Sequence, residues 1–523
     1  MREHVGVTTS HGAAPQTADR GSRSRLLAAG AGVFTGLAGV AVSEAMASLV
    51  RLRLSPPYAV AEAVIEVTPG DLALDLIHIF GRWDKPLLLV GVGLGLLLLS
   101  ALAGVLALRK LWWGHLVFLG TGAVGLLAVM TRPGVGTVAV LPVALGAATW
   151  VVLLGLLVGP LQDAGESTAG SADRRTFLVR AGLVALGALV VGVGGQLVGR
   201  QRRVVEDLRA RLRLPVTRGT VPAGAEVAVP EMPPWRSPND EFYRIDTAVV
   251  VPTVDVDEWR LRIHGMVERE LTLTFDDLLE RRLTEDWVTI CCVSNEVGGD
   301  LIGNAWWSGV RVADLLAEAG VLPGADAVLQ TSHDGWNCGT PLVALTDDRS
   351  SLLAVAMNGE PLPIEHGFPV RMVVPGLYGY VSATKWVVDL EVTRFEDFTA
   401  FWTERGWAER GPVRTQSRID VPRANHRVMA GDVRVGGVAW AQHTGIDKVE
   451  VRVDGGAWTE VDLGRVPDAD TWVQWAGTVS VDPGIHTLAV RATDRSGYTQ
   501  TAVQRDVVPD GATGWHTIEF TAE

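Results

Sequence analysis

The chain has 523 residues, of which 48% are hydrophobic, and it carries a net charge of −13. This length exceeds one domain, the apolar content excludes a disordered chain, and three cysteines, two of them adjacent, exclude a disulfide framework. Residues 1–200 carry 15 Lys and Arg against 11 Asp and Glu, whereas the remaining residues carry 31 against 48. The acidic C-terminal part lacks the basic face that nucleic acid requires, so no nucleic-acid partner is expected.

Five apolar stretches lie in the first 200 residues, each close to the ~20 residues that cross a bilayer. We place them at 26–50, 86–108, 111–130, 137–158 and 177–198. Lys and Arg concentrate in the N-terminal tail, after the second stretch and before the fifth. By the positive-inside rule, this predicts a cytoplasmic N-terminus and a C-terminal half on the extracytoplasmic side of the cell membrane. Residues 1–25 would be a cytoplasmic tail and residues 26–199 a multi-pass transmembrane region.

Two further features concern this membrane region. Residues 173–178, DRRTFL, resemble a twin-arginine export signal ahead of the fifth stretch. Only His115 lies inside a predicted span, and one histidine cannot provide the paired axial ligands of a membrane haem, so no haem is predicted. We therefore interpret the bundle as an anchor and leave any further role open.

The periodicity changes after a charged linker at 200–229. Residues 259–264 and 270–275 alternate apolar and polar side chains, as strands do, whereas residues 275–280 and 312–320 have the pattern of short helices. This mixed α+β pattern continues to about residue 400. From about residue 411 only strand and turn patterns occur, which predicts a β-sandwich.

The first chemical signal is a cysteine at the end of a predicted strand. Residues 289–295, TICCVSN, lead from the strand into a polar turn that ends at Gly298 and Gly299. A partly exposed cysteine among backbone N–H donors favours the thiolate, which binds metals or attacks electrophiles. Alternatively, a single cysteine can be a small buried apolar residue.

A second signal is a group of polar side chains between residues 357 and 386. A turn carries His366, a short strand carries Arg371, and a later loop carries Ser382 and Lys385. Imidazole, guanidinium, hydroxyl and ammonium groups on adjacent loops have the chemistry that binds an organic phosphate.

Together these motifs resemble the sulfite oxidase family of molybdopterin-dependent oxidoreductases. The resemblance runs from about residue 230 to 523 and rests on the following segments: 237–244 (SPNDEFYR), the cysteine strand, 358–363 (NGEPLP), 366–376 (HGFPVRMVVPG), 385–386 (KW), 436–440 (GGVAW), 449–456 (VEVRVDGG) and 472–475 (WVQW). It implies a membrane-anchored bacterial member, of actinobacterial type, with three parts. These are a five-helix transmembrane bundle, an α+β molybdopterin domain at 230–405, and an all-β immunoglobulin-like sandwich at 406–523 through which relatives often dimerise. A homodimer is therefore one expectation.

The resemblance also assigns roles to residues. Cys292 would bind molybdenum, and Asp334 and Trp336 would line the approach to the metal as catalytic residues. The pterin and its phosphate would contact Asn239, Tyr243, Arg244, His366, Arg371, Ser382, Thr384 and Lys385. The implied cofactor is molybdenum-molybdopterin, and the implied reaction is two-electron oxygen-atom transfer with a small-molecule oxo donor or acceptor and an unidentified electron-transfer partner.

One departure from the family pattern affects the substrate. Enzymes that oxidise sulfite place an arginine soon after the cysteine, whereas Glu296 follows here. The substrate is therefore left as sulfite-like or an S-oxide. Other readings are a non-catalytic receptor or scaffold that retains the fold, a transporter with an extracytoplasmic sensor domain, and a cysteine hydrolase with Cys292 as nucleophile and His366 as base.

Overall fold

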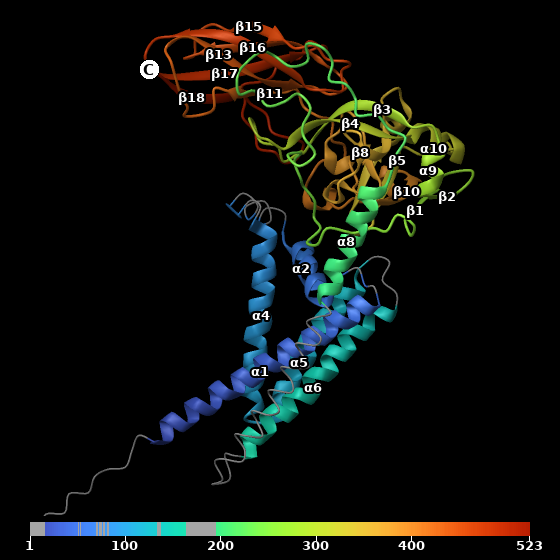
Figure 1. The fold of residues 1–523 in the computed structure, drawn as a ribbon, viewed down its shortest axis with the longest axis vertical. Coiled ribbons are helices and arrows are strands. Elements are labelled where there is room, and N and C mark those ends of the chain that lie inside the picture. Colours follow the sequence, from blue (N-terminus) through green and yellow to red (C-terminus); the bar gives the residue numbers. More distant parts are fainter. Residues whose placement is uncertain are drawn as a thin grey trace, which may run out of the picture. The chain divides into compact units, whose positions relative to one another are not determined.

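The computed structural model describes residues 16–50, 54–69, 83–132, 137–163 and 195–523, together with a few single positions between these ranges. The chain forms two compact units, Met1–Arg202 and Arg203–Glu523 (Figure 1). Most of the fifth predicted apolar stretch and the whole twin-arginine-like motif lie outside the described residues.

The described part of the first unit is helical. Its elements are α1 (Gln16–Leu49), α2 (Pro56–Val67), α4 (Asp84–Ala107), α5 (Leu111–Met130), η2 (Thr137–Ala139) and α6 (Val140–Asp163). Among the described residues, four segments are long and apolar enough to cross a membrane: Ser24–Leu49, Asp84–Ala107, Leu111–Met130 and Thr137–Gly159. They coincide within two residues with the first four predicted stretches. Leu98 in α4 is 71% exposed, as expected for a side chain that faces lipid.

Close packing between α1 and α4 depends on residues without side chains. A Cβ atom at Gly32 in α1 would clash with the carbonyl oxygen of Ser100 in α4, and one at Gly104 would clash with the carbonyl oxygen of Ala28. Glycine at both positions therefore lets the two helix backbones approach, which is the kind of close contact that small residues allow between membrane helices.

We expect Gly104→Leu to destabilise the helical unit by about 1–3 kcal/mol, because the new side chain must push α1 away from α4. Thermal unfolding in detergent measures this loss. Gly93→Leu in the same helix is the matched control, since a Cβ there meets no atom within 4 Å. Equal stability of the two variants would contradict the packing that we describe.

The second unit starts with the C-terminal part of α8 (Gly195–Arg211) and is rich in strands. We call its part up to residue 405 the central domain and its part from residue 416 onward the C-terminal domain. The central domain has two sheets, with strand orders β2-β1-β10-β5-β6 and β3-β4-β7-β8, and β9 pairs with β7. Its elements are β1 (Arg260–Gly265), β2 (Leu271–Thr274), α9 (Phe275–Leu279), β3 (Thr284–Cys291), β4 (Ile302–Arg311), α10 (Val312–Ala319), β5 (Ala327–Ser332), β6 (Asn337–Pro341), α11 (Leu342–Thr346), β7 (Leu352–Met357), β8 (Glu360–Pro361), η3 (Ile364–His366), β9 (Arg371–Val373), η4 (Gly379–Val381), β10 (Val387–Thr393), η5 (Phe395–Asp397) and η6 (Thr403–Arg405).

The expected helices and strands of the central domain are present. The Asp277 carboxylate accepts the Thr274 backbone N–H, and the Thr274 hydroxyl accepts the Asp277 N–H, so that α9 begins with a capping box. Gly320, with φ +72°, ends α10 in the left-handed conformation that glycine adopts readily. The mixed α+β pattern is thus confirmed for this domain.

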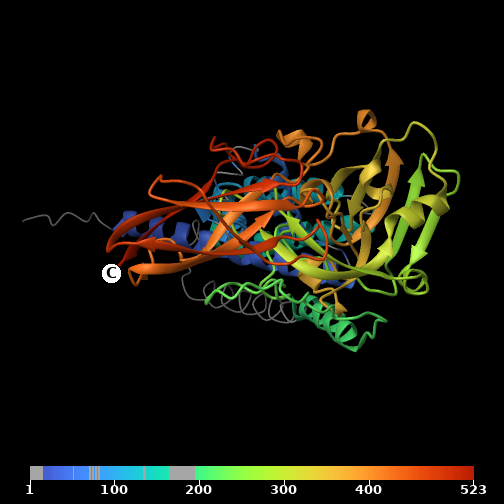
Figure 2. The ribbon, with the colours of Figure 1, turned by 90° about the horizontal axis from the view of Figure 1, so that it is seen from above.

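The C-terminal domain consists of β11 (Gln416–Val421), β12 (Arg427–Val428), β13 (Gly431–Trp440), β14 (Ile446–Val453), β15 (Thr459–Leu463), β16 (Val473–Val481), β17 (Gly484–Asp494) and β18 (His516–Ala522). These strands are hydrogen-bonded in the order β11-β13-β16-β15-β14-β17-β18-β12. Figure 2 shows the strands of this domain in orange and red. One apolar core takes residues from β11, β13, β14, β16, β17 and β18. The prediction of strands and turns alone is confirmed, and the immunoglobulin-like topology stays a prediction.

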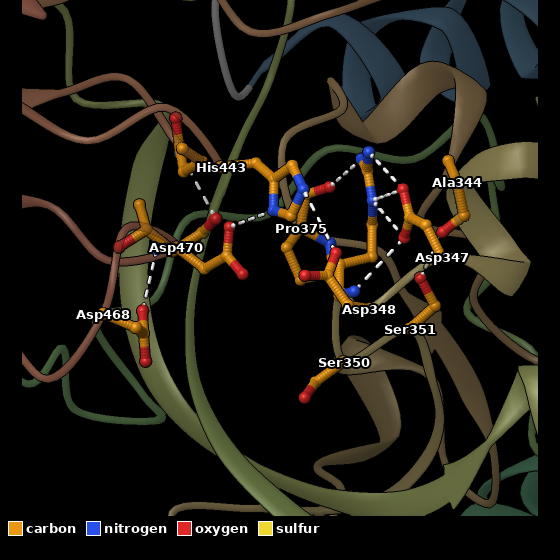
Figure 3. A network of polar contacts seen from close by, with 12 residues as sticks. Ala344, Asp347, Asp348, Ser350, Ser351, Pro375, His443, Asp468 and Asp470 are labelled. Atoms are coloured by element: carbon orange, nitrogen blue, oxygen red, sulfur yellow. Dashed lines mark hydrogen bonds and ion pairs between the residues drawn. The ribbon is translucent and has the colours of Figure 1, made fainter. Parts of the chain in front are cut away.

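The central and C-terminal domains meet in a polar network (Figure 3). On the central side, Arg349 pairs with Asp347 at 2.8 Å and donates to the Pro375 carbonyl at 2.9 Å. On the C-terminal side, the His443 ring lies 3.3 Å from the Asp470 carboxylate and 4.0 Å from the Asp348 carboxylate of the central domain. Burial, with the nearby carboxylates of Asp470 and Asp286, raises the pKa of Asp468 to about 6. This region also borders β3, the strand that leads to Cys292.

Candidate active site

A cavity in the central domain collects side chains from four separate segments, within 242–247, 290–294, 332–336 and 366–407. Its walls include most of the predicted site residues: Tyr243, Cys292, Asp334, Trp336, His366, Arg371 and Lys385. These side chains come from the segment before β1, from the loops after β3 and β5, from η3 and β9, and from the loop before β10. The fold therefore brings the cysteine and the cationic group into one cavity.

The two adjacent cysteines have different surroundings. Cys291 is the last residue of β3 and pairs with Ile302 in β4, and its thiol donates to the Cys292 carbonyl at 3.4 Å. Cys292 is the next residue, and it lines the cavity whereas Cys291 does not. The expectation of a partly exposed thiol was wrong, because Cys292 is only 8% exposed. Burial raises the pKa of the Cys292 thiol, although hydrogen bonds from the backbone and side chain of Ser294 oppose this increase.

Arg371 is the most deeply buried cation of the cavity, with 4% of its surface exposed. Its guanidinium donates to the carbonyls of His366 and Met372, at 3.2 Å and 3.3 Å, and lies 5.1 Å from the centre of the Trp307 ring. Within the described part of the chain no carboxylate forms an ion pair with it. Burial lowers the pKa of Arg371 to about 10, which still leaves it charged at neutral pH.

Lys385 and His366 complete the group. The Lys385 ammonium lies 2.8 Å from the Asp246 carboxylate, and burial lowers its pKa to about 8 although Asp246 favours the charged form. Nε2 of His366 lies 3.1 Å from the Asn239 carbonyl. Burial, with the charges of Arg371 and Lys385, lowers the pKa of His366 to about 4, so its ring is neutral and donates through Nε2 to that carbonyl.

Four predicted site residues do not line the cavity. The Asn239 side chain bonds to Met357 and Asn358, and Arg244 forms an ion pair with Asp246 at 2.9 Å. The Ser382 hydroxyl donates to the Tyr378 carbonyl at 2.9 Å, and the Thr384 hydroxyl lies 3.2 Å from the Cys338 sulfur. Both hydroxyls therefore form hydrogen bonds within the protein, that of Ser382 across η4 and that of Thr384 with β6.

Several lining residues were not predicted from the sequence. They are the carboxylate of Asp246 and the aromatic side chains of Tyr380, Trp402 and Trp407. The ring centres of Tyr380 and Trp407 are 5.8 Å apart, and those of Trp402 and Trp407 are 6.2 Å apart. Glu296, expected to repel an anionic substrate if it lined the site, is exposed and is not part of the cavity wall.

The pair of Asp246 and Lys385 gives a pH prediction. Because the pKa of Lys385 is about 8, we expect the affinity of the cofactor-free protein for sulfate to fall as the pH rises through about 8. Asp246→Asn removes the charge that favours the ammonium form, so this fall should move to lower pH. Calorimetric titration measures it, since sulfate keeps its charge over this range. An unchanged midpoint in the variant would contradict the pairing.

The cavity can be compared with the chemistry of known proteins. The family described as oxidoreductase molybdopterin binding domain matches residues 248–402, which include Cys292 and the cationic group. An uncharacterized oxidoreductase, YuiH, of Bacillus subtilis (strain 168) is 36% identical over 183 residues, covering 34% of this chain and 87% of that protein. The mitochondrial sulfite oxidase of Homo sapiens is 30% identical over 323 residues, covering 52% of this chain. Among solved structures, the sulfane dehydrogenase SoxCD of Paracoccus pantotrophus is 26% identical, with a TM-score of 0.49, and the match covers 56% of this chain and 84% of that one.

These relationships define an oxidoreductase of the molybdopterin-binding class. The chain belongs to the sulfite oxidase family. It spans 58% of the length of the human sulfite oxidase. The residues present fit the implied cofactor: Arg371 is a buried cation without a carboxylate partner among the described residues, and it shares a cavity with a thiol. An isolated buried charge is costly, and an anionic pterin phosphate would balance it.

Proposed function

We propose that this protein catalyses two-electron oxygen-atom transfer at a molybdenum centre held by Cys292. The observation that carries the proposal is that Cys292 lines the same cavity as Arg371, Lys385 and His366. A soft thiolate suits a metal that is also held by the sulfurs of a pterin, and the cations suit the phosphate at the other end of such a cofactor.

The cofactor would supply the two-electron redox couple and the metal site that accepts the oxygen atom from an S-oxide or gives one to an oxo acceptor. Cys292 would hold the metal and fix its distance from the cavity wall. Arg371 and Lys385 would bind the phosphate, and His366, a neutral ring whose Nε2 donates to the Asn239 carbonyl, would accept one hydrogen bond at Nδ1. Asp334 and Trp336 would border the substrate, because both line the cavity from the loop after β5.

The substrate side of the cavity favours an S-oxide over inorganic sulfite. Within residues 195–523, Arg371 and Lys385 are the Arg and Lys side chains that line the cavity, and we assign both to the phosphate. The remaining wall includes Tyr380, Trp402 and Trp407, which suit the apolar groups of an organic substrate. With both cations bound to the phosphate, a dianion such as sulfite would find no Arg or Lys side chain in the wall to pair with.

Four helices of membrane-spanning length support a membrane anchor. We propose that the N-terminus is cytoplasmic, that a fifth helix leads to an extracytoplasmic catalytic half, and that the twin-arginine-like motif directs its export after cofactor insertion. An electron-transfer partner would then be needed on that side of the membrane.

Elemental and pterin analysis of the detergent-extracted protein tests the proposal. We expect one molybdenum and one pterin per chain, and turnover of organic S-oxides with an artificial electron donor. If the protein is produced in a host with intact cofactor synthesis and contains neither molybdenum nor pterin, the result would instead support the interpretation as a non-catalytic scaffold. Molybdenum-loaded protein that turns over sulfite but no S-oxide would overturn the substrate assignment.

A further inference from the structure

The C-terminal domain binds the strand that leads to Cys292. Thr289 lies three residues before Cys292 in β3, and it makes three hydrogen bonds to that domain. Its backbone N–H donates to the Asp470 carbonyl at 3.0 Å, its hydroxyl accepts the Trp472 N–H at 2.8 Å, and its carbonyl accepts from the Gln442 side chain at 3.3 Å. β3 is thus held on the central side by β4 and on the other side by the C-terminal domain.

The loop that follows Cys292 is a closed turn. The Cys292 N–H donates to the Leu301 carbonyl at 2.9 Å, and its carbonyl accepts the Asn295 N–H at 3.1 Å. The Asn295 side chain accepts the Leu301 N–H at 2.9 Å, and the Gly299 N–H donates to the Glu296 carbonyl at 2.9 Å. Because these bonds connect both ends of the loop, a displacement at Gly299 would be transmitted to Cys292.

Two residues of the C-terminal domain hold this loop. Arg418 in β11 donates from its Nη1 to the Gly299 carbonyl at 2.9 Å. The His516 ring lies against Gly298, where a Cβ would clash with it, and its Nδ1 accepts the Ile419 N–H at 2.9 Å. Arg418 is itself fixed, because its Nε lies 2.7 Å from the Asp420 carboxylate and only 8% of its surface is exposed.

We propose that Arg418 is a positioning residue for Cys292: it clamps the loop from Asn295 to Gly299, so that the C-terminal domain completes the active site. The inference rests on the proposed function only for the metal-binding role of Cys292. A charge-assisted hydrogen bond to a backbone carbonyl is directional and restricts the loop more than apolar packing does. The C-terminal domain would then set the reactivity of the cysteine without contacting the substrate.

The test compares Arg418→Ala with Arg491→Ala. Arg491 also pairs with a carboxylate of the C-terminal domain, that of Glu450 at 3.0 Å, and the contacts of its side chain that the structure shows lie within that domain. The first readout needs no cofactor: the rate at which iodoacetamide alkylates Cys292 in protein from a cofactor-deficient host, assigned by peptide mass spectrometry. We expect an increase of about tenfold in Arg418→Ala and no change in Arg491→Ala.

In loaded enzyme we expect Arg418→Ala to shift the absorption band of the metal-bound thiolate. It should also lower kcat by about tenfold and leave KM within about twofold. Arg418→Lys, which keeps a donor and the charge beside Asp420, should recover part of both effects. Because Arg418→Ala leaves Asp420 buried without its partner, an Arg418→Ala, Asp420→Asn double variant controls for misfolding and should show the same fast alkylation.

Wild-type alkylation rates in folded Arg418→Ala and in the double variant would overturn the inference. An unshifted absorption band in loaded Arg418→Ala would overturn it as well. Wild-type protein that holds no molybdenum would instead overturn the proposed function, and the alkylation result would still decide whether Arg418 clamps the loop.

Discussion

Cys292→Ala is expected to abolish oxygen-atom transfer and to leave the fold intact. The sulfur lies in the cavity wall immediately after β3, so its removal deletes the proposed metal ligand and little apolar packing. We expect a loss of activity of at least about 1,000-fold and a change in unfolding free energy of about 1 kcal/mol or less. Activity assays, molybdenum content and thermal unfolding of the purified protein measure these effects.

Cys291→Ala is the matched control, since it makes the same substitution at the neighbouring cysteine. Cys291 is 1% exposed, and its thiol points into the protein. This variant should lose some stability and keep the molybdenum. An active Cys292→Ala enzyme beside an inactive Cys291→Ala enzyme would show that the wrong sulfur was assigned.

The fold could be predicted from the sequence where a local pattern is strong. Four apolar stretches of ~20 residues coincide within two residues with the four candidate spans of the described residues, because a bilayer-spanning helix needs an uninterrupted apolar run. The alternation of apolar and polar residues predicted a strand at 259–264, where the structure has β1. The preference for glycine after the last turn of a helix likewise predicted the end of α10 at Gly320. Helix α2 was missed, because its 12 residues are too few to give a membrane signal.

The site was predictable only in part, because sequence motifs do not show which way a side chain points. Cys292, His366 and Arg371 lie in motifs whose chemistry is recognisable, and the structure brings them to one cavity. Ser382 and Thr384 lie in the same stretch, but their hydroxyls bond within the protein. The roles of Asp246 and Arg418 depend on contacts with residues more than 100 positions away, Lys385 and Gly299, so no local pattern shows them.

Arg371→Met is expected to have opposite effects on cofactor binding and on the stability of the cofactor-free protein. The guanidinium is buried with two backbone carbonyls as partners and, among the described residues, no carboxylate pairs with it, so its charge is costly until an anion binds. Methionine fills a similar volume without this cost. We expect cofactor-free Arg371→Met to be as stable as the wild type or more stable by about 1 kcal/mol, and to hold the cofactor about 10–100-fold more weakly.

The matched control is Arg349→Met. Arg349 is also mostly buried, but it pairs with Asp347 at 2.8 Å and does not line the cavity. Its hydrogen bond and charge hold the pKa of Asp347 below its usual value, so removal of the cation leaves a half-buried carboxylate without its partner. This variant should therefore lose stability and keep its molybdenum and pterin. Thermal unfolding of protein from a cofactor-deficient host, with cofactor analysis of protein from a competent host, separates the two outcomes. If Arg371→Met retained full cofactor, or if both variants lost stability equally, the cation at 371 would be a structural group and the phosphate would have to bind elsewhere.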